Sequence, residues 1–181
     1  MRGIPAAPAA IELTDARTGH RAPLRAMTTL FDLALIAVDR DQQLPSAVQQ
    51  ALADIARVMT GADTTVAVLA VGADRDGAVE VADRIGTACR VFTDPDGRDA
   101  EALGLAATPG LVWVSTAPEL LAVESGFDRA RWSEVLRAMA QRWAWSRPVL
   151  PTNAPAVAEP LLVGARPDLT VEKEAADDRA A

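Results

Sequence analysis

The sequence has one cysteine, Cys89, and one histidine, His20, and both scarcities exclude chemistry. A single cysteine cannot form an internal disulfide or a cysteine-based zinc site, and one histidine adds too few ligands to build a metal cluster. We therefore expect no metal and no cofactor. His20 lies in a polar turn with no recognisable nucleophile, so it supports no catalytic triad. The carboxylates of "DPDG" at 94–97 are typical of a type I turn rather than of a cation site.

Positive charge and long apolar runs are also scarce. Lys173 is the only lysine, and the net charge of -7 argues against a nucleic-acid partner, which would require clustered Lys and Arg. No apolar run approaches the roughly 20 residues of a membrane helix, and Pro5 and Pro8 interrupt the short apolar start that a signal peptide would extend. We expect a cytoplasmic protein without direct membrane insertion. The use of arginine for lysine, with many alanines, indicates a bacterial genome rich in GC.

The length of 181 residues suits one α/β domain with a tail. We expect a flexible leader at 1–10 and a folded domain over 11–145. The segment 146–181 contains five prolines, has no sustained periodicity and ends in charged residues. This composition is typical of an extended or disordered tail.

Apolar periodicity within 11–145 predicts alternating strands and helices. The runs at 31–39 and 64–72 are almost unbroken, which indicates strands buried on both faces. Between them, 44–59 carries its apolar residues at helical spacing. Two strands joined by a helix are expected to be parallel. The other expected elements are a hairpin over 11–24, a helix over 76–86, a strand over 89–94, a helix over 98–105, a hairpin over 110–126 and a helix over 128–145.

This order of elements resembles the thioredoxin-like superfamily, in its TlpA-like and peroxiredoxin-like variants. Three stretches carry the resemblance: "IELTDARTGHRAPL" at 11–24, "VFTDPDGRDAEALGL" at 91–105 and "ATPGLVWVST" at 107–116. The resemblance covers roughly 11–143. It implies an α/β thioredoxin-like fold, in which helices flank a central mixed sheet.

The resemblance also indicates where a site should lie. The superfamily keeps a Cys-x-x-Cys pair or a peroxidatic cysteine where the first central strand meets its helix, but 38–46 contains no cysteine. We therefore expect no catalytic residue there. Thr108-Pro109 matches the superfamily's Thr-cis-Pro pair, whose backbone can pair with an extended peptide. The candidate binding residues of this cis-Pro groove are Asp39, Arg40, Asp41, Gln42, Thr108 and Pro109. A solvated polar turn is the alternative interpretation of 39–41.

These observations predict a redox-inactive thioredoxin-like protein that acts as a protein-binding accessory, assembly or structural subunit. A protein partner or larger complex is expected, with Trp145, Pro148 and Pro151 as candidate contacts. The alternative is a single-cysteine thiol oxidoreductase, or an enzyme that depends on a low-molecular-weight thiol. It would use Cys89, activated by a helix N-terminus or by a basic neighbour such as Arg84 or Arg90. A small, partly buried residue is the simpler interpretation of Cys89.

Overall fold

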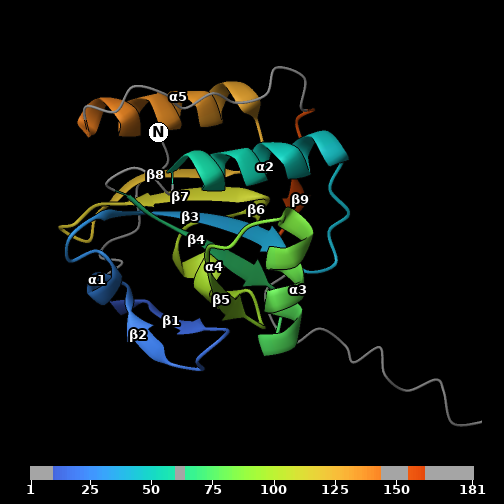
Figure 1. Cartoon of the computed structure of the whole chain (residues 1–181), viewed down its shortest axis with the longest axis horizontal. Helices are drawn as coiled ribbons and strands as arrows, with labels where there is room; N and C mark the ends of the chain where they lie inside the picture. Colours follow the sequence, from blue (N-terminus) through green and yellow to red (C-terminus); the bar gives the residue numbers. More distant parts are fainter. Residues whose placement is uncertain (1–9, 60–63, 144–154, 162–181) are drawn as a thin grey trace, which may run out of the picture.

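The computed structural model describes residues 10–59, 64–143 and 155–161, which form a mixed sheet of seven strands with helices on both faces (Figure 1). The strand order is β2-β1-β5-β4-β3-β7-β8. These strands are β1 (Glu12–Asp15), β2 (Arg21–Pro23), β3 (Asp32–Asp39), β4 (Thr64–Val71), β5 (Arg90–Asp94), β7 (Gly110–Val114) and β8 (Leu120–Ser125). The helices are α1 (Leu24–Met27), α2 (Ser46–Met59), α3 (Arg75–Ile85), α4 (Arg98–Ala102) and α5 (Arg129–Arg142).

The predicted strand–helix–strand unit is confirmed as β3-α2-β4. β3 and β4 are parallel, in register from Asp32 opposite Thr64 to Asp39 opposite Val71. β5 adds to β4 in the same direction, whereas β7 pairs antiparallel with β3 and β1 pairs antiparallel with β5. Both predicted hairpins, β1–β2 and β7–β8, are antiparallel. The sheet therefore has a parallel centre with antiparallel edges.

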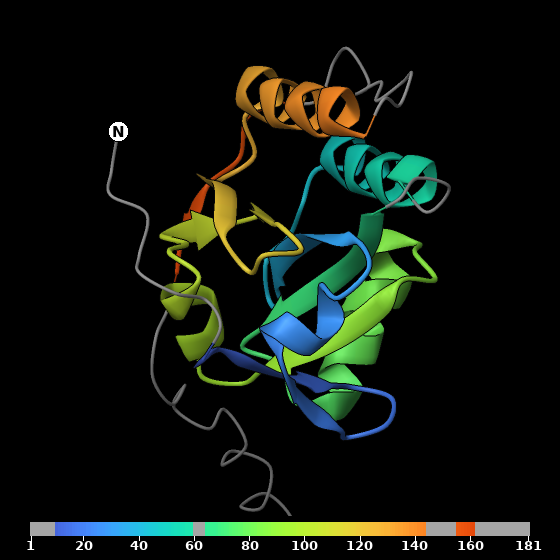
Figure 2. The ribbon, with the colours of Figure 1, turned by 90° about the vertical axis from the view of Figure 1, so that its left-hand side faces the viewer.

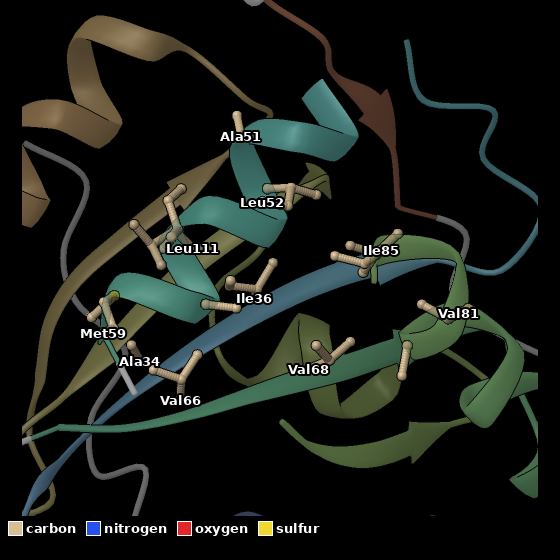
Figure 3. Close-up of a cluster of buried hydrophobic side chains, with 14 of the residues drawn as sticks. Ala34, Ile36, Ala51, Leu52, Met59, Val66, Val68, Val81, Ile85 and Leu111 are labelled. Carbon is tan, nitrogen blue, oxygen red and sulfur yellow. The ribbon is translucent and has the colours of Figure 1, made fainter. Parts of the chain in front are cut away.

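The unbroken apolar run of β3 is explained by its burial on both faces. Its even-numbered residues, such as Ile36, belong to a core cluster with α2, α3 and α5. Its odd-numbered residues, such as Leu35, belong to a second cluster, which includes residues of α4 and of the β1–β2 hairpin. Figure 3 shows Ile36 and Val68 of the sheet facing Leu52 of α2. Alternating side chains of one strand thus serve two cores.

The longer helices follow their sequence signals. In α2 the buried residues recur every three or four positions, as the periodicity predicts. The predicted N-cap of α5 is also confirmed, because the Asp128 side chain accepts a hydrogen bond from the Arg131 N–H at 2.9 Å. α5 ends at Arg142, three residues earlier than expected. The candidate partner contacts Trp145, Pro148 and Pro151 lie outside the described residues. None of the described helices is long and apolar enough to cross a membrane.

Two features of the fold were not predicted from the sequence patterns: the short helix α1 and a second, separate sheet. β6 (Ala107–Thr108) and β9 (Glu159–Pro160) form a separate two-stranded sheet. β9 belongs to the part of the expected tail that the structure describes, 155–161, which lies beside β6 in Figure 1. Most of the expected leader and tail lies outside the described residues, so the division at 10 and 145 stays a prediction.

Candidate binding site at the β3–α2 junction

The site lies where β3 ends and α2 begins. The connecting loop at 40–45 contains no cysteine, so the position at which the superfamily keeps its nucleophile is occupied by other residues. The predicted cis peptide bond between Thr108 and Pro109 is present. Because Gly110 pairs with Ala37 of β3, the cis proline lies at the same end of the sheet as the junction.

Gln42 joins the junction to the cis-proline strand. Its Nε2 donates a hydrogen bond of 3.0 Å to the carbonyl oxygen of Thr108, and both residues are 1% exposed. The other side-chain atom, Oε1, is buried without a hydrogen-bond partner among the described residues. Gln42 is therefore a buried amide that is hydrogen-bonded to the cis-proline strand through its nitrogen, while its oxygen is unpaired among the described residues.

The polar turn at 39–41 is held from two sides. The Asp39 carboxylate is buried and accepts a 2.8 Å hydrogen bond from the Asp41 N–H. The guanidinium group of Arg84, in α3, donates to the carbonyl oxygens of Arg40 at 2.7 Å and Asp39 at 3.0 Å. The exposed Arg40 side chain lies over Gly77 and comes within 3.9 Å of an Asp74 oxygen. The structure thus brings Gln42 to Thr108, while Asp39 and Arg40 are tied to α3.

The outer edge of the cis-proline strand is occupied by the chain's own tail. Thr108 lies opposite Glu159, and Ala107 opposite Pro160, in an antiparallel pair. The Leu161 N–H extends this pairing with a 3.0 Å hydrogen bond to the Ala106 carbonyl oxygen. Figure 2 shows this segment along one side of the molecule, between α5 and α4. The sequence alone leaves open whether this groove is free or occupied by the chain's own tail, because the only signal at 155–161 is a proline-rich composition compatible with any extended path.

The carboxylates near the site lie at the turn that precedes α4 and in its first residues. The predicted turn at 94–97 is confirmed by a 3.3 Å hydrogen bond from the Gly97 N–H to the Asp94 carbonyl oxygen. The buried Asp94 side chain accepts hydrogen bonds from the N–H groups of Asp99 at 3.2 Å and Ala100 at 2.9 Å. Burial raises the pKa of Asp94, and burial together with the charge of Asp94 raises the pKa of Asp99 to about 6. Within the described residues, no group of three or more His, Cys, Asp or Glu is arranged to hold a metal ion.

Cys89 lies at the opposite end of the sheet. Asp39 is level with Val71 and Asp94, and Cys89 precedes Asp94 by five residues, about 16 Å along the strand. The basic neighbours considered for it are engaged elsewhere: Arg90 Nε lies 2.6 Å from an Asp15 oxygen, and Arg84 binds the junction. Cys89 is half-buried and lines an open cavity of about 880 Å³.

Comparison with known proteins identifies the fold. No protein-family model and no curated protein sequence matches the chain. An uncharacterized conserved protein from Geobacillus kaustophilus is 15% identical and has a TM-score of 0.64, with 92% of this chain and 94% of that chain covered.

The descriptions of two further structures name a thiol:disulfide interchange protein and an alkyl peroxide reduction activity. One, from Chlorobium tepidum, is assigned to the thiol:disulfide interchange protein DsbE and is 14% identical, with a TM-score of 0.61 over 77% of this chain and 98% of that chain. The bacterioferritin comigratory protein of Xanthomonas campestris is 14% identical, with a TM-score of 0.56 over 77% and 96%. The chain therefore has a thioredoxin-like fold. Identities this low carry the fold and no activity.

Proposed function

We propose that this chain is a redox-inactive thioredoxin-like protein that binds another protein, as an accessory, assembly or structural subunit in the cytoplasm. The observation that carries the proposal is Gln42, a buried amide bonded to Thr108 where thiol enzymes of this fold keep their nucleophile. A carboxamide cannot attack a disulfide or a peroxide, because that step needs a thiolate. Cys89, about 16 Å away along the strands, is too far to take its place.

A binding role is supported by the way the junction is held. The Arg84 guanidinium fixes the carbonyl oxygens of the loop, while Arg40, Asp41 and Gln43 are exposed at its rim. A loop that is already ordered loses little conformational freedom when a partner binds. This rim and the neighbouring β6 strand form the proposed contact surface.

The redox half of the proposal is tested with the purified full chain and a Cys89→Ser variant. Both are assayed for reduction of insulin disulfides by dithiothreitol and for consumption of peroxide. We expect both proteins to match the rate without protein, because neither has a thiol at the junction. Catalytic turnover that Cys89→Ser abolishes would overturn the proposal.

The binding half is tested by charge reversal at the rim. We expect Asp41→Lys to reduce the amount of partner captured from the native cytoplasm by the tagged full chain. The matched control is Glu134→Lys, which makes the same charge reversal at an exposed position of α5, outside the rim. Equal loss of partner from both variants, or from neither, would remove the rim from the contact surface.

The cavity beside Cys89 favours one second candidate, an enzyme that uses a small thiol. Its volume of about 880 Å³ is in the range of small-molecule sites, and Arg57, Thr65 and Thr87 share its lining. This candidate predicts that Cys89 is alkylated at neutral pH at least as fast as free cysteine. It also predicts turnover with glutathione that Cys89→Ser removes. Slow alkylation without turnover would exclude it.

A further inference from the structure

The segment 155–161 lies against the site in the manner of a bound peptide. Its antiparallel pairing with β6 is accompanied by a second pairing, in which the Val157 N–H donates to the Phe127 carbonyl oxygen at 2.9 Å and the Phe127 N–H donates back to Val157. The segment therefore uses backbone hydrogen bonds along most of its length. Backbone pairing of this kind gives affinity, and side-chain positions then give specificity.

Two apolar side chains anchor the segment. Val157 packs against the core cluster that contains Phe127 and Trp132. Leu161, four residues later, packs against the other cluster, on the opposite face of the seven-stranded sheet. The segment thus passes from one face of the sheet to the other at the end where the cis proline lies. A ligand for this path needs apolar residues at both positions.

Between the anchors, the backbone approach restricts side-chain size. A Cβ added to Gly126 would lie 2.5 Å from the Ala158 Cβ and 3.2 Å from the Val157 carbonyl oxygen. Gly126 also has a φ of +78°, which favours glycine. Glycine is therefore required at position 126, where the backbone passes directly against Ala158. Pro160 has no N–H, and the Leu161 N–H makes the hydrogen bond to Ala106 instead, so proline fits at that position.

The segment is held less firmly than the strands of the main sheet. β9 has two residues, and five of the seven described residues of the segment are exposed: Pro155, Ala156, Ala158, Glu159 and Pro160. A ladder of this length is marginal by itself. Thr108, which lies opposite Glu159 in this ladder, also accepts a hydrogen bond at its carbonyl oxygen from Gln42, whose Oε1 is left unpaired among the described residues. The pairing is specific in its side-chain positions and weak in its extent.

We propose that segment 155–161 is an internal ligand of the β6 edge. A partner's extended segment with apolar residues at the positions of Val157 and Leu161, and with a proline allowed at the position of Pro160, binds there by displacing it. This inference rests on the proposed function in one respect: the β6 edge belongs to the partner-binding surface. The segment then acts as an intramolecular competitor. The apparent affinity for the partner is the intrinsic affinity multiplied by the fraction of molecules in which the edge is free.

The test uses a fluorescein-labelled peptide with the sequence of 155–161, Pro-Ala-Val-Ala-Glu-Pro-Leu, and measures its binding by anisotropy. The proteins are the full chain, the double variant Val157→Asp/Leu161→Asp, and the control Ala156→Asp, which adds a charge at an exposed neighbour. We expect the double variant to bind at least tenfold more tightly than the unmodified chain, because its own segment no longer competes. Ala156→Asp should bind like the unmodified chain. Circular dichroism of the double variant and of the single variant Leu161→Asp, each compared with the unmodified chain, shows whether the substitutions leave the domain folded. If only the double variant is misfolded, Leu161→Asp replaces it in the binding test.

A second measurement tests the position opposite Gly126. Gly126→Ala, added to the double variant, should weaken binding at least tenfold, and a peptide with glycine in place of the Ala158 equivalent should recover part of the loss. Gly19→Ala is the matched control, since Gly19 has a φ of +70° and no described atom within 4 Å of the added Cβ. It introduces the same backbone strain without approaching the segment, so it should leave binding unchanged.

Two results would overturn the inference. Equal peptide affinity of the unmodified chain and the double variant would show that the segment does not compete for the edge. A concentration-dependent dimer that Leu161→Asp abolishes would assign the edge to the segment of a second copy. Failure of the proposed function is separately visible: disulfide reduction in the insulin assay would remove it while leaving the peptide result intact.

Discussion

The two ends of β3 differ in how completely their buried polar side chains are hydrogen-bonded. At the first end lies the carboxylate of Asp32. This carboxylate is fully buried at the start of the strand. It accepts hydrogen bonds from the indole N–H groups of Trp113 at 2.9 Å and Trp143 at 3.0 Å, and from the Thr116 N–H at 3.0 Å. Arg142 Nε lies 3.2 Å away and balances the charge. Both oxygens of this buried carboxylate therefore have hydrogen-bond partners, which tie β3, β7 and α5 together.

At the other end, the buried Gln42 makes one hydrogen bond and leaves its Oε1 unpaired among the described residues. The strand beside it is completed by a two-residue tail pairing. Buried polar groups with all partners in place specify one structure, whereas incompletely satisfied ones are uncommon and tend to mark sites of function. The difference indicates that the Asp32 end secures the fold, whereas the incompletely hydrogen-bonded Gln42 end is the one we propose for binding.

The largest expected effect on stability comes from removing the carboxylate at the Asp32 end of β3. Asp32→Ala should lower the free energy of unfolding by about 3 to 5 kcal/mol, because it leaves Arg142 and two indole N–H groups without their acceptor. Urea unfolding followed by tryptophan fluorescence measures this loss. The control is Asp54→Ala, which removes a carboxylate paired with Arg57 at the surface and should cost about 0.5 kcal/mol or less. A loss at Asp32 as small as that of the control would contradict the comparison.

A smaller effect on stability is expected from the ionisation of Asp99, in α4. Burial and the charge of Asp94 raise the pKa of Asp99 from its ordinary 3.8 to about 6, so the folded chain holds this proton more tightly than the unfolded chain. The free energy of unfolding should therefore fall as pH rises from about 4 to 6. We expect Asp99→Asn to be more stable than the unmodified chain at pH 7, by about 1 to 2 kcal/mol. The difference should vanish below pH 4.

The control for this pH dependence is Asp15, which has the opposite sign. Burial alone would raise the pKa of Asp15, but hydrogen bonds from Arg90 and Thr18 outweigh it and lower the pKa to about 2. Its contribution to stability is present above about pH 4 and is lost as pH falls toward 2. Asp15→Asn should therefore be less stable than the unmodified chain at pH 7. A gain from Asp99→Asn that persists at pH 3 would show that its origin is not ionisation.

The smallest effect is expected from Gln42 itself. Gln42→Leu should change the free energy of unfolding by about 1 kcal/mol or less, because the lost hydrogen bond to Thr108 is offset by removal of a buried unpaired oxygen. Chemical denaturation of Gln42→Leu beside Asp32→Leu gives the contrast directly. A loss of more than about 2 kcal/mol at Gln42 would contradict it, since the amide would then be as well satisfied as Asp32.

Much of the fold was predictable because its signals are local. The apolar runs of β3 and β4, and the spacing of Val48 and Leu52 in α2, reflect the burial of those same residues. The cis proline and the absence of a junction cysteine were likewise visible as motifs. The site was predicted only in outline. Gln42 was one of several candidate groove residues, and nothing in its neighbours indicated that it alone would be buried against Thr108.

The sequence by itself determined which segments form the seven-stranded sheet and the longer helices, and that the junction lacks a cysteine nucleophile, because periodicity and residue identity are properties of short stretches. The tertiary structure alone decided the roles of Asp32 and Gln42. Their partners are 81 and 111 positions away for the two indoles, and 66 positions away for Thr108. The pairing of β9 with β6 is equally remote. Such contacts depend on the path of the whole chain. A polar residue at the end of an apolar strand gives the same sequence pattern whether its side chain faces water or a buried partner.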